Sequence, residues 1–355
     1  MNTNISQTLF TLLRAGLFAE HNEKCSMNGL DAAGWDKLYM LAEEQRVTGL
    51  IAAGIDRLNA KVPLEIKLQF VGSALQTEQR NKEMNAFIAD IVAKMREKGI
   101  YTLLVKGQGI AQCYEKPLWR PSGDVDFLLD IENYRKAIDF LRPLSSDSKR
   151  EENYSSHLGL SIDPWYVEVH GSLRTGLSAK VDRVVDEVHE DTFKNNKVRV
   201  WNNGGVDVLL PAPDEDVFFV FTHFIKHFYK EGMSLRQTCD WCRLLYTYKD
   251  SLNYGLLKSR IRKAGLVSEW KAFAVLAIEY LGMPAEVMPL FDVRCKRDDL
   301  RAKKLIELIL GENSGSKAKD TLSIAKIFPI NTIRFAPAIF LNVNSLKIKE
   351  RLLGN

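Results

Sequence analysis

The stretch Gly123-Asp124-Val125-Asp126-Phe127-Leu128-Leu129 carries two aspartates one residue apart at the start of an apolar run. Apart from Asp126, the residues from Val125 to Leu129 are apolar and favour β-structure, so the run predicts a buried strand. Residues i and i+2 of a strand point to the same face, roughly 7 Å apart along the chain. Two carboxylates placed in this way repel each other, and burial makes their ionisation harder still. A divalent cation removes that cost, and such oxygen ligands suit Mg²⁺ or Mn²⁺.

The residues before this strand have the composition of a phosphate-binding turn. A second predicted strand over 101–105 leads through Lys106-Gly107-Gln108-Gly109 into a short predicted helix over 110–114. A strand that ends in a glycine-containing turn and opens a helix presents backbone N–H groups to a phosphate. Lys106 and Arg120 add positive charge near the same turn. The two segments together predict a site for a metal ion and a phosphate-bearing ligand.

In chain order, Lys106-Gly107, a short helix with a tyrosine, Arg120 and Gly123-Asp124-Val125-Asp126 resemble the nucleotidyltransferase superfamily with the polymerase-β-like core. More narrowly, they resemble its uncharacterised bacterial nucleotidyltransferase family, over about residues 100 to 245. That superfamily combines a Gly-Ser or Gly-Gly turn, an Asp-x-Asp strand and a third carboxylate on a later strand. The resemblance implies that Gly107 is the turn glycine and that Asp124 and Asp126 are metal ligands. For the two aspartates, a turn cap with a salt bridge to Lys106 or Arg120 is the alternative.

The best match to the third carboxylate is Glu168, in Trp165-Tyr166-Val167-Glu168-Val169-His170. This segment alternates apolar and polar residues, as a half-buried strand does. His170 follows Glu168 at i+2 and therefore shares its face. We expect His170 to contact the triphosphate, to accept a proton from the substrate hydroxyl or to hydrogen-bond Glu168. The alternative is a histidine at the end of the strand whose hydrogen bonds are all made to other groups of the protein.

The resemblance implies an enzyme that moves an NMP from an NTP to an acceptor hydroxyl. Two Mg²⁺ or Mn²⁺ ions, about 4 Å apart, would be held by Asp124, Asp126 and Glu168. The nucleotide would be held by Lys106, Gly107, Gln108, Arg120, Gly123 and His170. The alternative is a catalytically decayed nucleotide-binding or protein-interaction module. Gln108 favours that alternative, because it stands where the superfamily has serine or glycine.

A further polar set follows the core, on predicted helices, and consists of His223, His227, Arg236 and Asp240. The two histidines stand at i and i+4, a spacing that can chelate zinc, but no third ligand accompanies them as in zinc-binding helices. The resemblance implies that the set contacts the nucleotide or braces the carboxylates. A polar network that ties the helices to the sheet is the alternative.

The chain as a whole predicts an α+β protein. A small mixed sheet with the polymerase-β-like core is expected between an N-terminal helical segment and a C-terminal helical domain. The predicted divisions are residues 1–100 (helical), 101–212 (core), 213–310 (helical) and 311–355 (linker and apolar tail). Further strands are predicted over 157–162, 166–170, 198–201 and 206–210. Helices are predicted near the N-terminus, from Asp31, over 64–98, 132–141, 214–230, 234–250, 253–265, 267–281 and 297–310.

Composition places the chain among soluble globular proteins. Of its 355 residues, 46% are hydrophobic and 26% are charged. The net charge of +4 gives no support for a long nucleic-acid track, so a small molecule or a protein is the preferred acceptor. Five scattered cysteines, an odd number, favour reduced thiols. The start of the chain has no signal-peptide pattern, and the apolar stretch over 327–343 is interrupted by prolines and an arginine. We therefore expect a cytoplasmic protein without a transmembrane segment.

Overall fold

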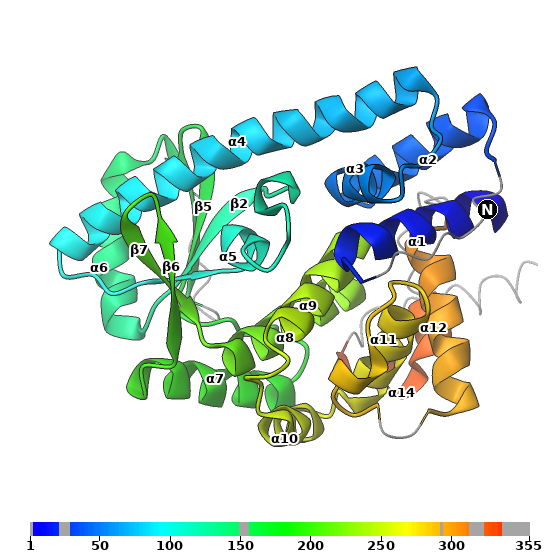
Figure 1. The fold of residues 1–355 in the computed structure, drawn as a ribbon. Helices are drawn as coiled ribbons and strands as arrows, with labels where there is room; N and C mark the ends of the chain where they lie inside the picture. The colour runs from blue at the N-terminus through cyan, green and yellow to red at the C-terminus, as the bar shows by residue number, and fades with distance from the viewer. Residues whose placement is uncertain (1–2, 21–28, 149–155, 292–293, 312–322, 336–355) are drawn as a thin grey trace, which may run out of the picture.

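The computed structural model describes residues 3–20, 29–148, 156–291, 294–311 and 323–335 (Figure 1). The predicted α+β class is confirmed. A small mixed sheet packs beside one long helix, and helices from both ends of the chain gather on the other side of the molecule (Figure 1).

Two parallel strands form the centre of the mixed sheet. The strand order is β1 (Leu103–Val105), β2 (Asp124–Leu128), β5 (Trp165–His170), β4 (His157–Ile162) and β3 (Asp147–Ser148). β2 and β5 run parallel, and the other neighbouring pairs are antiparallel. The register places Asp126 directly opposite Glu168. Both carboxylates therefore lie on adjacent strands in the interior of the sheet.

A separate hairpin pairs β6 (Val198–Asn203) with β7 (Val206–Pro211). Both strands were predicted, and each is slightly longer than expected. The turn consists of Gly204 and Gly205, whose φ angles of 61° and 93° suit glycine. The hairpin packs against β1 and α4 and extends the β-layer on that side.

Among the described residues, four helices precede the sheet: α1 (Thr3–Leu17), α2 (Ala32–Glu44), α3 (Thr48–Arg57) and α4 (Leu64–Glu97). The sequence did not predict α3, which holds glycines at positions 49 and 54 that weaken a helical signal. Those glycines have a packing role. A Cβ at Gly54 would lie 2.1 Å from the carbonyl oxygen of Leu12 in α1. Only glycine allows the two helix backbones to approach so closely.

The long helix α4 joins two apolar cores. Its 34 residues span about 51 Å at about 1.5 Å per residue. Its first half contributes Ile66 and Phe70 to a cluster shared with the N-terminal and C-terminal helices. Its second half contributes Met84 and Ile88 to a cluster with the sheet and α6. The domain boundaries expected from the sequence stay a prediction, since packing continues across them.

Further helices follow β1 in the described part of the chain, nine of them with defined bounds. They are α5 (Gly107–Ala111), α6 (Ile131–Leu141), α7 (Ala179–Lys194), α8 (Pro213–Lys230), α9 (Leu235–Thr247), α10 (Tyr254–Ala264), α11 (Val267–Glu279), α12 (Lys296–Ile309) and α14 (Pro329–Phe335). Short 3₁₀ helices occur at Pro117–Trp119, Arg142–Leu144 and Ala285–Val287. The prediction for α5 was wrong by three residues at its start, because the helix begins at Gly107. The sequence did not predict α7, although Ser178 caps it and its valines are buried at helical spacing.

The amide of Gln45, just after α2, joins three segments that are far apart in the sequence. Its Nε2 donates to the carbonyl of Ile309 in α12, and its Oε1 accepts from the backbone N–H of Leu235 in α9, both at 3.0 Å. The Gln45 carbonyl also accepts from the N–H of Arg236 at 3.3 Å. Gln45 is only 3% exposed, so these bonds replace bonds to water.

Most of the predicted linker and tail, 312–322 and 336–355, lies outside the described residues, as does Cys25. Within the described ranges, no helix is both long enough and apolar enough to cross a membrane.

Candidate active site

The three carboxylates predicted as metal ligands lie together on adjacent parallel strands. Oxygen atoms of Asp124, Asp126 and Glu168 all fall within 4.8 Å of one another. The parallel register of β2 and β5 produces this arrangement, because it sets Asp126 beside Glu168. Oxygen donors at such separations fit a divalent cation of the Mg²⁺ or Mn²⁺ type.

Asp126 is the buried member of the group, with 2% exposure. Its Oδ1 accepts a hydrogen bond from Lys106 Nζ at 2.7 Å and lies 2.9 Å from His170 Nε2. Burial by itself would raise the pKa of Asp126, but Lys106 and His170 outweigh it and lower that pKa. Burial would also lower the pKa of Lys106, yet the carboxylates of Asp126, Glu168 and Asp124 raise it. Both groups are therefore held in their charged forms.

The other two carboxyls have opposite surroundings. Repulsion from Asp126, followed by burial, raises the pKa of Asp124. Burial also acts to raise the pKa of Glu168, but His157 and His170, each 3.4 Å away, bring it well below its usual range. Asp124 is therefore the member of the group whose ionised form is least stabilised by its surroundings. A cation bound beside Asp124 would relieve that repulsion.

Lys106 has a backbone conformation that is nearly restricted to glycine. Its φ of 58° and ψ of −146° cost about 1–3 kcal/mol for a residue with a side chain. Gly107 follows with a φ of 34°, and a Cβ there would lie 3.4 Å from the Asp124 carbonyl oxygen. The turn from β1 into α5 therefore lies against the start of β2. Strain of this kind persists where the surrounding contacts fix it, and here Lys106 reaches Asp126.

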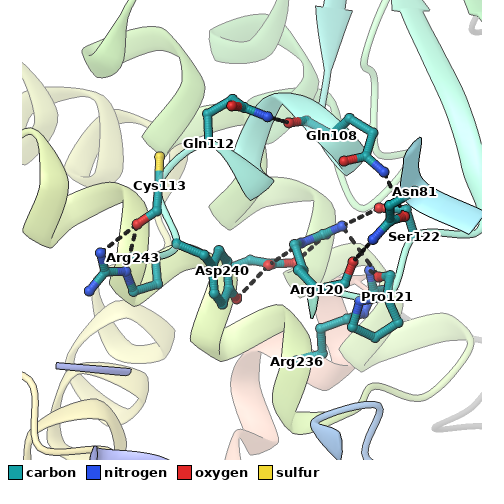
Figure 2. A network of polar contacts seen from close by, with 11 residues as sticks. Asn81, Gln108, Gln112, Cys113, Arg120, Pro121, Ser122, Arg236, Asp240 and Arg243 are labelled. Carbon is teal, nitrogen blue, oxygen red and sulfur yellow. Dashed lines mark hydrogen bonds and ion pairs between the residues drawn. The ribbon is translucent and has the colours of Figure 1, made fainter. Parts of the chain in front are cut away.

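Gln108 points away from the carboxylates. Its side chain is 1% exposed, and its Nε2 donates to Asn81 Oδ1 of α4 at 2.7 Å (Figure 2). The same Nε2 also contacts the sulfur of Met84, on the same helix, at 3.5 Å. The glutamine side chain therefore occupies the space between α5 and α4 and leaves the opposite face of the turn open.

Arg120 and Asp240 form a buried two-pronged ion pair (Figure 2). Arg120 Nε donates to Asp240 Oδ1 and Nη2 donates to Oδ2, each at 2.7 Å. The Tyr114 hydroxyl donates to the same Oδ1 at 2.7 Å, and Arg120 Nη1 donates to Ser122 Oγ at 2.8 Å. The charge of Arg120 is thus balanced inside the protein, which the sequence did not predict.

His223 and His227 lie one turn apart on α8. Their Nε2 atoms are 2.9 Å apart, and His227 Nδ1 lies 2.7 Å from Glu231 Oε2. Burial lowers the pKa of both imidazoles, and nearby Lys106 lowers them further. In the described ranges, the possible three-ligand metal groups lie on β2, β4 and β5 and do not include this pair.

A cavity of about 1280 Å³ opens over the carboxylates. Every site residue predicted from the sequence lines it except Gln108. The cavity also brings in residues that the sequence did not single out. His157 stacks on His170, with ring centroids 4.7 Å apart, and Arg46 comes from the end of α2. The β4–β5 hairpin pairs Ile162 with Trp165, and that register fixes His157 opposite His170. A signal for His157 was therefore present in the hairpin, whereas none existed for Arg46.

A comparison with protein families gives one match. The model of a family described as uncharacterised nucleotidyltransferase matches residues 31–282, more than two thirds of the chain. No match was found among curated proteins or among solved structures. The matched range contains the mixed sheet and all the predicted site residues, and it ends before α12.

Proposed function

The chain belongs to the uncharacterised nucleotidyltransferase family, and from that premise we propose that it moves an NMP from an NTP to an acceptor hydroxyl with the help of a divalent cation. One observation carries the proposal. Asp124, Asp126 and Glu168 bring carboxylate oxygens within 4.8 Å of one another beside a cavity of about 1280 Å³. Such a cavity is large enough for a ligand of nucleotide size, since small-molecule pockets run to about 1,000 Å³.

The chemistry of the donor set supports Mg²⁺ or Mn²⁺. All three ligands are carboxylates, and Asp124 carries charge that no described neighbour fully compensates. A bound divalent cation would neutralise charge on the triphosphate and the leaving pyrophosphate. We propose that two such ions bind, both held by Asp124, Asp126 and Glu168.

Residues of the chain itself would position the reacting groups. Lys106 Nζ lies beside the carboxylates and would attract the β and γ phosphates by its charge. Gly107 allows a phosphate to approach the backbone closely. His170 contacts both Asp126 and Glu168 and would hold their carboxylates in a fixed orientation. Phosphoryl transfer depends largely on such positioning and on electrostatic stabilisation.

Arg120 has a different proposed role from the one implied by resemblance. Because Asp240 balances its charge, we propose that Arg120 fixes the loop before β2 and so positions Asp124. The acceptor is proposed to be a small molecule or a protein hydroxyl, because a net charge of +4 attracts nucleic acid only weakly.

The orientation of Gln108 supports an active enzyme over a decayed module. A glutamine in the phosphate-binding turn would obstruct phosphate if its side chain entered the cavity. Its amide instead bonds Asn81 on the far side of α5. The backbone path of the turn therefore stays compatible with a bound phosphate.

Calorimetric titration of the four NTPs with Mg²⁺, with pyrophosphate release followed in parallel, tests the proposal. Wild type is compared with Asp124→Asn and with Asp139→Asn, a matched control on the exposed face of α6. We expect Asp124→Asn to reduce release by about a thousandfold and the control to leave it unchanged. Full release by Asp124→Asn would contradict the proposal. Binding by wild type without any release would favour the nucleotide-binding module.

A further inference from the structure

The cations that line the cavity differ in how their charges are balanced. Lys106 pairs with Asp126 and Arg120 pairs with Asp240. Arg46, Arg236 and Lys226 also line the cavity, and among the described residues none of them has a carboxylate within ion-pair distance. Lys226 lies on α8, on a different wall. Arg46 and Arg236 lie close to each other, because the N–H of Arg236 donates to the carbonyl of Gln45.

Arg236 is a guanidinium with unused hydrogen-bonding capacity. Its Nη1 donates to the Pro121 carbonyl at 3.3 Å, while its Nε is buried with no partner in the described part of the chain. Burial lowers the pKa of Arg236, and the charges of Arg120 and Arg46 act in the same direction, while the carboxylate of Asp240 acts against them. An ionised group that is desolvated and only partly bonded lowers the stability of the folded state. The charge of Arg236 is therefore only partly compensated within the described residues, and a bound anion would complete its partners.

Arg46 occupies a backbone position that normally belongs to glycine. The N–H of Val47 bonds to the Ala42 carbonyl at 2.8 Å, and the N–H of Arg46 bonds to the Glu43 carbonyl at 2.9 Å. These two bonds form the Schellman motif that ends α2, with Arg46 at the position where glycine is preferred. The φ of Arg46 is 55°, in the left-handed region. An arginine is thus kept where glycine would be more stable, and its exposed side chain lines the cavity.

The two arginines lie near the carboxylates. Arg236 bonds Pro121, which precedes Asp124 by three residues, and such a segment spans at most about 11 Å. A smaller cavity of about 130 Å³ adjoins the main one at this point and shares Arg46, Arg120 and Arg236 with it. A group bound by the arginines would therefore remain within reach of the proposed metal site.

We propose that Arg46 and Arg236 form a binding site for a phosphate group of one of the two substrates. Two guanidinium groups present paired N–H donors that match phosphate oxygens, and Asp240 is already occupied by Arg120. The inference rests on the proposed function in assigning the phosphate to a substrate. The phosphate belongs either to the NTP or to a phosphorylated acceptor, and the chemistry of recognition is the same for both.

The test begins with inorganic phosphate and EDTA, so that no metal and no turnover are involved. Phosphate affinity is measured by calorimetry for wild type, Arg46→Gly, Arg236→Gln and the charge control Lys303→Gln on the exposed face of α12. Arg46→Gly retains the backbone conformation that the end of α2 requires, so its fold is preserved. We expect each arginine substitution to weaken phosphate binding at least about tenfold and the control to leave it unchanged.

Titration of the NTPs with Mg²⁺ on the same proteins then identifies the source of the phosphate. A matching loss of NTP affinity assigns the phosphate to the nucleotide, and unchanged NTP affinity assigns it to the acceptor. The proposal is overturned if wild type does not bind phosphate in EDTA, or if both arginine variants bind it as wild type does. Phosphate binding that persists in a protein without pyrophosphate release would reject the proposed function while leaving this site in place.

Discussion

The Arg120–Asp240 and Lys106–Asp126 pairs line the same cavity, but only the first is matched in its direct bonds, with one guanidinium bonded twice to one carboxylate. Arg236 lies near that pair without a direct bond to it. A single guanidinium meets a single carboxylate through two 2.7 Å bonds in the first pair, and Tyr114 adds a neutral donor. In the second, one ammonium group faces three carboxylates. Removing either partner of a buried, mutually bonded ion pair is strongly destabilising, whereas unmatched charge is typical of a site that receives a ligand. We therefore assign Arg120 and Asp240 to the support of the cavity wall, and Lys106 and the three carboxylates to the binding of a ligand.

The largest effect should come from breaking the matched pair. Asp240→Asn leaves Arg120 buried without a counter-charge and beside Arg236, so we expect a loss of about 3–5 kcal/mol in the free energy of unfolding. Urea denaturation measures it. The double variant Arg120→Met/Asp240→Leu removes both charges and should recover most of the loss. A loss below about 1 kcal/mol for Asp240→Asn would contradict a structural role.

A smaller loss of stability is expected in the cluster formed by Lys106 and the three carboxylates. Asp126→Asn in metal-free buffer should cost about 1–3 kcal/mol, because the amide oxygen can still accept from Lys106 and that lysine keeps some contact with water. Asp139→Asn on the surface of α6 is the control and should change stability little. A loss as large as that of Asp240→Asn would show that the two pairs are equivalent.

Asp124→Asn should have the opposite effect and stabilise the folded protein. In metal-free buffer at neutral pH, removing its repulsion with Asp126 should raise the free energy of unfolding by about 1 kcal/mol. Because the folded-state pKa of Asp124 is raised, its ionised form lowers the free energy of unfolding, and this penalty has its full size above that pKa. The penalty shrinks as the pH falls through the raised pKa and is gone below the ordinary value of 3.8.

Denaturation of wild type and Asp124→Asn across this pH range checks the sign, since the two curves should converge in acid. Adding Mg²⁺ should stabilise wild type and have little effect on the variant, because the cation binds the folded state. Equal stabilisation of both proteins by Mg²⁺ would remove Asp124 from the metal site.

The smallest effect should come from Arg46→Gly, measured without phosphate. The left-handed conformation costs a non-glycine residue about 1–2 kcal/mol, and the greater freedom of unfolded glycine offsets about 0.5–1 kcal/mol of that cost. A net gain of about 0.5 kcal/mol in stability follows. Thermal denaturation with Lys67→Gly as a contrast should show a loss of stability, because Lys67 is an exposed residue inside the helix α4.

The sequence allowed the carboxylates to be predicted because the relevant information is local. Asp124 and Asp126 lie on one short strand, and the alternation around Glu168 marks another. The α+β class and most helices followed from periodicity in the same way. The missed helix α7 carried a usable signal, with Ser178 as its cap and buried valines at helical spacing, but valine is a weak helix former.

Other features of the site could not be predicted from local patterns. The partner of Arg120 is 120 residues away in the chain, and the tertiary packing of α9, which contacts α5, brings Asp240 to it. The positive φ angles of Lys106 and Arg46 contradict local preference, since both positions favour glycine. The direction of Gln108 depends on Asn81 of α4, which no spacing rule connects to the turn. Conflicts between local preference and fold are common at functional sites.

The amide of Gln45 bears on how small a working piece of this protein can be. It bonds the carbonyl of Ile309, which lies beyond the range matched by the family, and the same stretch of α12 forms part of the cavity wall. A fragment trimmed to residues 31–282 would leave that buried amide without its acceptor and the cavity open on one side. A shortened protein that keeps this cavity closed therefore has to extend through α12. An exchange of segments between related proteins should transfer the end of α2, the start of α9 and the end of α12 together.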